Sequence, residues 1–197
     1  ISIFLILILG ISHGALDNIK GRKLLKIYGY ESIVIFYFVY ILISLLIVIC
    51  WLIFPNIVLF LFLVVAAYHF GKEDTIFSFK KKFFLSECLF FLKGSSVILA
   101  PLLFKRNETY EIFRILNFNI FEYSIFSDQL IIILLCLSFF SSLCIGNRKN
   151  IDTKAIMIMD FLSLIILNFF LTPVLAFTLY FCFLHSIRHS ISLVFEL

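Results

Sequence analysis

The sequence contains little charge and few residues that interrupt helices. Only 14% of its 197 residues are Asp, Glu, Lys or Arg, and it has three prolines and seven glycines. A soluble domain is roughly 25% charged and about 45–50% apolar, whereas 63% of this chain is hydrophobic. This excludes a soluble enzyme, a nucleic-acid-binding domain and a disordered segment, because so few charges cannot cover one globular core. The long apolar runs predict an all-α, polytopic integral membrane helix bundle.

Cysteine pairs, internal repeats and low-complexity linkers are also absent. The five cysteines are odd in number and no two have the CxxC spacing, so neither a disulfide framework nor a zinc knuckle is indicated. Without repeats or linkers, we expect residues 1–197 to form a single transmembrane helical domain. Residue 1 is Ile, inside an apolar run, so we expect the chain to be a fragment at its N-terminus.

Seven apolar runs approach membrane-spanning length and are bounded by charges or turn signals. They cover Ile1–Leu16 (truncated), Ser32–Phe54, Asn56–Phe70, Phe83–Phe104, Asp128–Ile145, Ala155–Leu171 and Pro173–Leu197. The third and the sixth are short for a full crossing. Pro55-Asn56 and Thr172-Pro173 mark tight turns, so we expect the flanking spans to form hairpins.

Lys and Arg are concentrated in alternate connections between these spans. Eleven of them follow the first, third and fifth spans. The long connection on the other side, Lys105 to Ser127, has three basic and three acidic residues. By the positive-inside rule the basic connections are cytoplasmic, and we expect the membrane to be the bacterial inner membrane.

The chain has only four histidines, and this topology places all of them in the cytoplasmic half of the membrane. His13 lies near the end of the first span, His69 closes the third, and His185 and His189 lie in the seventh. Residues four apart share one face of an α-helix, so His185 and His189 could offer two nitrogens to one metal ion. The other two histidines would complete an all-imidazole site, and imidazole suits iron, copper, zinc and nickel alike.

Acidic residues at a similar depth are candidates for orienting these histidines. Metal-bound imidazoles usually donate their other N–H to a carboxylate, a carbonyl or water. Asp17, Asp74 and Asp160 are the candidates, and the first two are equally well explained as ordinary interfacial acids. Arg188 either extends to the cytoplasmic surface or pairs with one of these acids.

The segments around the histidines resemble the motifs of the Brp/Blh family of membrane-bound β-carotene 15,15′-dioxygenases. Gly10 to Asp17 is similar to G-L-P-H-G-A-L-D, with Ile11-Ser12 in place of Leu-Pro. His69 to Asp74 resembles H-F-G-x-x-D, and His185 to His189 resembles H-S-x-R-H. These three motifs contain every histidine of the chain, while elsewhere the resemblance is only in hydropathy. Family members also tend to continue with further helices, which makes the C-terminus a second expected point of truncation.

The resemblance implies that His13, His69, His185 and His189 bind one Fe(II), towards the cytoplasmic side. It further implies that O₂ cleaves the central double bond of β-carotene, giving two molecules of all-trans-retinal. This substrate dissolves in the lipid bilayer, so its binding site should be apolar and reached between helices. The aromatic neighbours of the histidines either line that tunnel or are ordinary core and lipid-facing residues: Tyr68, Phe70, Tyr180, Phe181 and Phe183. Nothing in the sequence indicates a nucleic acid or a protein partner.

Two other functions stay open from the residues alone. A haem-binding redox protein needs two histidines on opposite sides of the macrocycle, which His185 and His189 on one helix face do not fit well. A non-catalytic carotenoid or retinal carrier would need no iron. Covalent retinal binding would need an intramembrane lysine, and Lys93 is the only one well inside a predicted span. Its sequence neighbours offer it no evident counter-ion.

Overall fold

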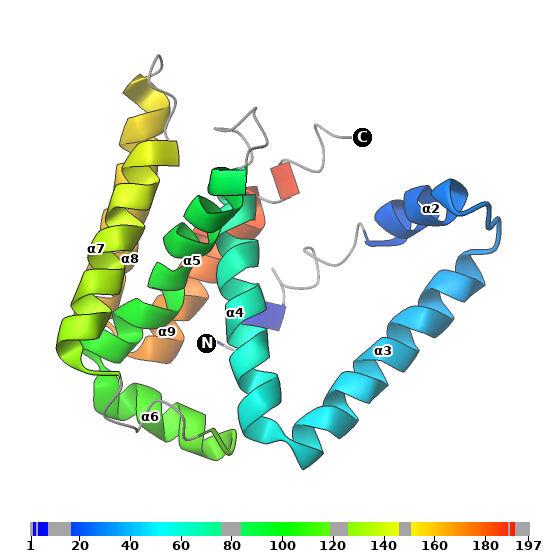
Figure 1. The fold of residues 1–197 in the computed structure, drawn as a ribbon, viewed down its shortest axis with the longest axis horizontal. Coiled ribbons are helices and arrows are strands. Elements are labelled where there is room, and N and C mark those ends of the chain that lie inside the picture. The colour runs from blue at the N-terminus through cyan, green and yellow to red at the C-terminus, as the bar shows by residue number, and fades with distance from the viewer. Residues whose placement is uncertain are drawn as a thin grey trace.

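The chain is described here by a computed structural model, which covers residues 2, 4–7, 17–75, 84–118, 126–145, 151–188 and 190–191. All the elements it defines in these ranges are helices (Figure 1). They are α2 (Asp17–Ile27), α3 (Ile33–Ile53), α4 (Pro55–Glu73), α5 (Phe84–Phe104), α6 (Arg106–Ile115), α7 (Asp128–Ile145), α8 (Ile151–Phe170), α9 (Pro173–Leu179) and the π-helix η2 (Tyr180–Ser186).

Five of these helices, α3, α4, α5, α7 and α8, are long and apolar enough to cross a membrane. This confirms the prediction of a polytopic all-α membrane bundle. The last predicted span is present as the shorter apolar segment Pro173–Ser186. Most of the first predicted span lies outside the described residues.

Two of the predicted spans are shorter than the helices that the structure shows. Helix α4 has 19 residues because it begins at Pro55 and continues past His69 to Glu73. Helix α8 has 20 residues because it begins at Ile151 rather than Ala155. In both cases the helix runs through charged residues that the sequence analysis treated as its boundary. Charges do not end a helix when its terminus reaches the membrane surface, where water solvates them.

Tight turns separate both predicted pairs of spans, but α3 diverges from α4 rather than packing against it as a hairpin (Figure 1). Phe54 alone separates α3 from α4, and Leu171-Thr172 separates α8 from α9. Pro55 and Pro173 each occupy the first turn of the following helix. Proline is tolerated there because its missing N–H would have no partner within the helix.

Helices α4 and α5 touch through their backbones. A Cβ atom built on Gly71 would lie 1.7 Å from the carbonyl oxygen of Phe90, and one on Gly94 would lie 1.8 Å from that of Ala67. Only glycine fits at either position. Such small residues let membrane helices approach closely where lipid gives no hydrophobic driving force for association.

Helix α7 packs on the other side of α5 through serines. The Ser138 hydroxyl donates a hydrogen bond of 3.1 Å to the carbonyl oxygen of Lys93, and Ser141 donates to that of Leu89. Ser138, Ser141 and Ser142 are all buried. Interhelical hydrogen bonds of this kind replace the apolar contacts that would hold helices together in water.

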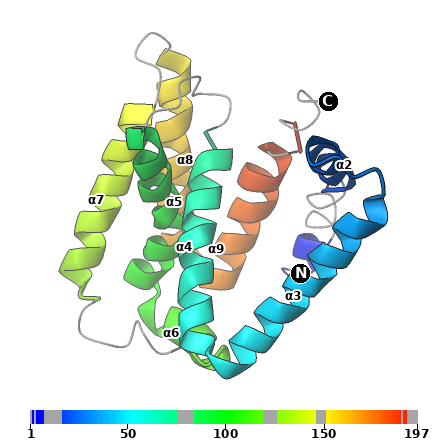
Figure 2. The same ribbon diagram turned by 45° about the vertical axis from the view of Figure 1, so that its right-hand side comes forward.

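Helices α3 and α6 lie at the margins of the bundle. Helix α3 extends away from the others beyond its junction with α4, and none of its residues is buried (Figures 1 and 2). Helix α6 crosses the end of the bundle next to the end of α5 (Figure 1). The Thr109 hydroxyl fixes it there by donating to the carbonyl oxygens of Pro101 at 3.1 Å and Lys105 at 2.8 Å. Helices α2 and α6 both occupy connections for which the sequence analysis predicted no helix.

Candidate functional site

Two of the four histidines meet between α4 and η2. The rings of His69, on α4, and His185, in η2, have centroids 5.3 Å apart and meet edge to face. His185 is completely buried, and His69 is partly buried. The other two predicted ligands, His13 and His189, lie outside the described residues.

His185 belongs to a π-helix rather than to the α-helix that its spacing from His189 predicted. The π-helical segment runs from Tyr180 to Ser186, and the α-helix resumes at Ile187. A π-turn inserts an extra residue into the helix, so it changes the direction in which the following side chains point. Such segments are frequent at functional sites. No feature of the apolar pattern distinguishes this segment from an α-helix.

Asp74 holds His185 in place from the end of α4. Its carboxylate accepts a hydrogen bond of 2.9 Å from Nδ1 of His185 and one of 2.6 Å from the hydroxyl of Tyr180. Burial raises the pKa of this carboxyl, but the hydrogen bond from His185 and the positive charge of Lys93 lower it to about 2. An ionised carboxylate can only accept, so Nδ1 carries the proton. In the neutral ring this tautomer leaves the lone pair on Nε2, which is the form that binds a metal.

Two further charged residues, whose side chains are 19% and 14% exposed, extend this site into a cluster of charges. Arg188 donates two hydrogen bonds to the carboxylate of Asp160, at 2.7 and 2.9 Å, and one to the backbone oxygen of Asp74 at 3.2 Å. Of the two alternatives for Arg188, the structure shows pairing with an acid. The bidentate pair joins η2 and the residues after it to α8.

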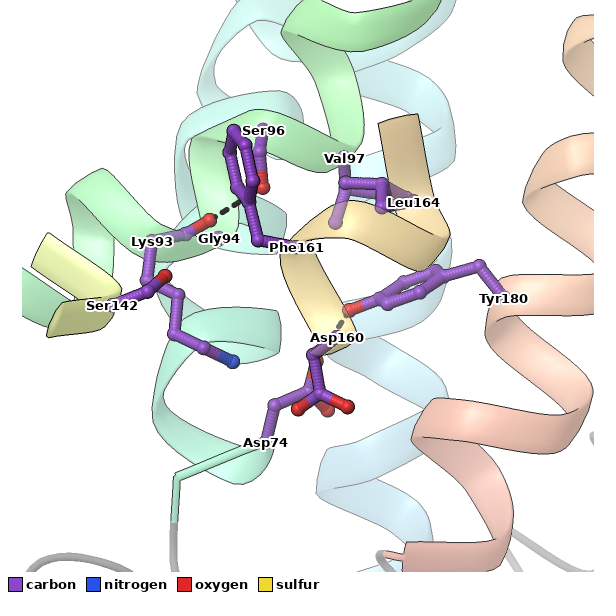
Figure 3. Close-up of a pocket in the computed structure, with 10 residues that line it drawn as sticks. All are labelled: Asp74, Lys93, Gly94, Ser96, Val97, Ser142, Asp160, Phe161, Leu164 and Tyr180. Carbon is purple, nitrogen blue, oxygen red and sulfur yellow. Dashed lines mark hydrogen bonds between the residues drawn. The ribbon is translucent and has the colours of Figure 1, made fainter. Parts of the chain in front are cut away.

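Lys93 of α5 is the fourth charged member of this cluster. It is 6% exposed, and its side chain points toward the carboxylates of Asp74 and Asp160 (Figure 3). The three residues and Tyr180 line a cavity of about 20 Å³, which is room for about one water molecule. As predicted, its sequence neighbours offer Lys93 no counter-ion. The carboxylates that its side chain faces come from outside α5, because Asp74 follows α4 and Asp160 lies on α8.

Three of the five predicted tunnel aromatics surround His185. Phe70 meets the imidazole edge to face at 4.8 Å, while Phe181 and Tyr180 stack on it at 5.8 and 6.3 Å. The hydroxyl of Tyr68 instead donates to Glu87 on α5. Phe183 is 51% exposed on the outer surface of η2.

The sequence profile of the family described as β-carotene 15,15′-dioxygenase matches residues 4–196. The chain belongs to this family. A curated β-carotene 15,15′-dioxygenase from uncultured marine bacterium 66A03 is 28% identical over 193 residues, which cover 94% of this chain. The chain spans 66% of the length of that relative. No solved structure is significantly similar.

This membership confirms the resemblance drawn from the three histidine motifs. Within the described residues, no group of three or more His, Cys, Asp or Glu side chains is close enough to hold a metal ion. That result does not test a four-histidine site, because His13 and His189 lie outside those residues. Of the three predicted orienting acids, Asp74 contacts His185 directly and Asp160 reaches the site through Arg188. Asp17 begins α2, and its side chain is outside the described part.

Two features of the site in this β-carotene 15,15′-dioxygenase family member were not predicted from the sequence. The first is the position of Lys93 beside the acids, although a lysine deep in an apolar run is itself a signal of function. The second is the role of Gly71 and Gly94, which bring α4 against α5. A glycine in each of two apolar helices is too weak a pattern to predict which helices meet.

Proposed function

We propose that this chain is the core of a membrane-bound enzyme that cleaves the central 15,15′ double bond of β-carotene. One O₂ supplies one oxygen atom to each of two all-trans-retinal molecules, so the reaction balances without a reductant. The proposed cofactor is one Fe(II), held by His13, His69, His185 and His189. The observation that carries this proposal is the hydrogen bond from Nδ1 of His185 to buried Asp74, beside His69.

The residues present fit an iron ion. Histidines that bind metals usually donate their other ring N–H to a carboxylate, which sets the tautomer and the ring orientation. His185 does so, and its fully buried position puts Nε2 in a water-poor environment beside the second imidazole. An all-imidazole set suits iron, and bound Fe(II) would supply the activation of O₂.

The remaining polar residues orient this site. Tyr180 donates a hydrogen bond to the carboxylate of Asp74, and the charge of Lys93 attracts that carboxylate. Arg188 donates to the backbone oxygen of Asp74 while it is paired with Asp160. Because every charge in the cluster faces an opposite one, it can persist inside the bundle at a moderate cost. We assign no proton transfer to it. Asp17 stays a predicted orienting residue on α2.

The substrate side of the site is aromatic. Phe70 and Phe181 flank His185 and exclude water from the region where the polyene reacts. Tyr180 is engaged with Asp74, so its proposed role is orientation rather than substrate contact. Tyr68 and Phe183 stay predicted tunnel residues. We place the site towards the cytoplasmic side of the bacterial inner membrane, from the distribution of Lys and Arg.

A carotenoid or retinal carrier is the alternative function. Covalent retinal binding at Lys93 is disfavoured, because the cavity at its side chain is only about 20 Å³. A non-covalent carrier would need neither iron nor an intact histidine pair.

The test is retinal content, by chromatography, of β-carotene-accumulating bacterial cells that express the chain or its His185→Ala variant. We expect retinal and loss of orange colour from the parent, and neither from the variant. Ile187→Ala is the control, because Ile187 follows the same segment and is 42% exposed. Iron per protein, measured on purified samples, should fall in His185→Ala only. Retinal from His185→Ala at the parental level would refute the iron site.

A further inference from the structure

A second, apolar cavity of about 270 Å³ lies between α4, α5, α6 and α9. It is distinct from the charged cavity at Lys93. Pro101, which lines it, stands inside α5, where it removes one backbone hydrogen bond and disfavours a straight helix. The Thr109 hydroxyl, also in its lining, donates to backbone carbonyls and so presents little polarity to the cavity. The remaining lining is aliphatic and aromatic.

Aromatic rings join the lining of this cavity to the histidine site. Phe70 lines the cavity and meets His185 at 4.8 Å. Phe177, also in the lining, stacks on Phe181 at 5.7 Å and 17°. Phe181 in turn stacks on His185 at 5.8 Å and 26°. Phe177, Phe181 and His185, which we call the ring ladder, therefore form a nearly parallel series from the cavity to the imidazole.

The cavity also opens toward the lipid. Phe62 and Val174, on α4 and α9, line it while remaining 61% and 46% exposed. From Phe62 to Phe70 the lining extends over eight residues of α4, which is about 12 Å at 1.5 Å per residue. An elongated hydrocarbon dissolved in the membrane can therefore enter sideways and extend to Phe70, which contacts His185.

We propose that this cavity binds one hydrocarbon arm of a long conjugated polyene, with the ring ladder aligning the chain at His185. The inference rests on the proposed function, and it names where that site takes its substrate. A flat, rigid polyene gains contact with parallel rings at little cost in conformational entropy, whereas a flexible acyl chain loses rotational freedom there. Central cleavage puts the reacting bond at the metal, so one arm must extend away from it into a space of this shape.

The test fills the cavity without touching the histidine site. Ile98, in the lining on α5, is changed to Trp, and the control is Ile166→Trp on α8, where Ile166 is 55% exposed. Full-length protein is loaded with β-carotene in membranes without O₂, purified, and assayed for bound carotenoid and for iron. We expect Ile98→Trp to retain about tenfold less β-carotene than the control, equivalent to a loss of about 1.4 kcal/mol. Its iron content should be unchanged.

Val174→Trp, at the mouth of the cavity, covers the case in which Ile98→Trp fails to fold. Its control is Val65→Trp on α4, at a position that is 63% exposed. Equal β-carotene retention by the folded cavity variants and their controls would overturn the inference. So would displacement of β-carotene from the parent by oleate as readily as by unlabelled β-carotene, because the cavity would then be a general acyl-chain site. Carotenoid binding that depends on Ile98, without retinal from the parent in air, would uphold the cavity and refute the proposed function.

Discussion

The contact between α4 and α5 predicts that the small substitution Gly94→Ala causes a large loss of activity. The added Cβ atom would lie 1.8 Å from the carbonyl oxygen of Ala67 and 2.5 Å from the backbone nitrogen of Gly71. Real Cβ atoms essentially never approach within 3.0 Å of a heavy atom from another part of the chain. Because both opposing atoms belong to the backbone of α4, no side chain can rotate away. The helices must separate by more than about 1 Å.

The expected change in the free energy of unfolding is the sum of two opposing contributions. Alanine improves helix propensity over glycine by about 1 kcal/mol, and overpacking costs about 1–3 kcal/mol. The net loss of stability is therefore small, about 1 kcal/mol. The functional loss should be larger, since α4 carries His69 and Asp74 while their partner His185 is on η2. A displacement of about 1 Å at such a site can reduce the rate about 100-fold.

Retinal formation and iron per protein measure the functional effect, and thermal unfolding in detergent measures the stability. Ser95→Ala is the control, because it introduces alanine at the adjacent position of α5 without the backbone contact. We expect Gly94→Ala to form at least about tenfold less retinal than Ser95→Ala, with a melting temperature only a few degrees lower. Parental activity in Gly94→Ala would refute the close approach of α4 and α5.

Four further predictions concern the charged cluster, the serine contacts and the metal. Asp74→Asn should lower iron affinity about 10- to 100-fold, measured by competition with a chelator, because it weakens the hydrogen bond that orients His185. Arg188→Leu leaves Asp160 without its hydrogen-bonded cation and should cost about 3 kcal/mol of unfolding free energy, which the double variant with Asp160→Leu should largely restore. No recovery would contradict the pairing. Ser138→Ala should cost only about 0.6 kcal/mol in the same measurement, the typical value for an interhelical hydrogen bond in a membrane. Chelation should abolish retinal formation, and Fe(II) but not Zn(II) should restore it.

The apolar runs determined the fold class and most helices by themselves. In lipid every backbone N–H and C=O must be hydrogen-bonded within the protein. A run of about 20 apolar residues can meet this requirement by itself only as a helix. Pro55 and Pro173 predicted two tight turns between helices correctly, for an equally local reason. The three histidine motifs indicated the family that the profile match then confirmed. These signals need no knowledge of which helix lies beside which.

Only the tertiary structure decided which residues and which helices face one another. The hydrogen bonds that join Asp74 to Tyr180 and His185 span 106 and 111 residues of sequence. The counter-ions of Lys93 come from other helices, and the apolar cavity exists only where four helices meet. A helix that is apolar on all sides has no polar face from which its rotation about its own axis could be predicted. Leu, Ile and Phe are equally stable facing lipid or the protein interior. Their rotation is set by glycines that permit close contact and by buried charges that must find opposite partners.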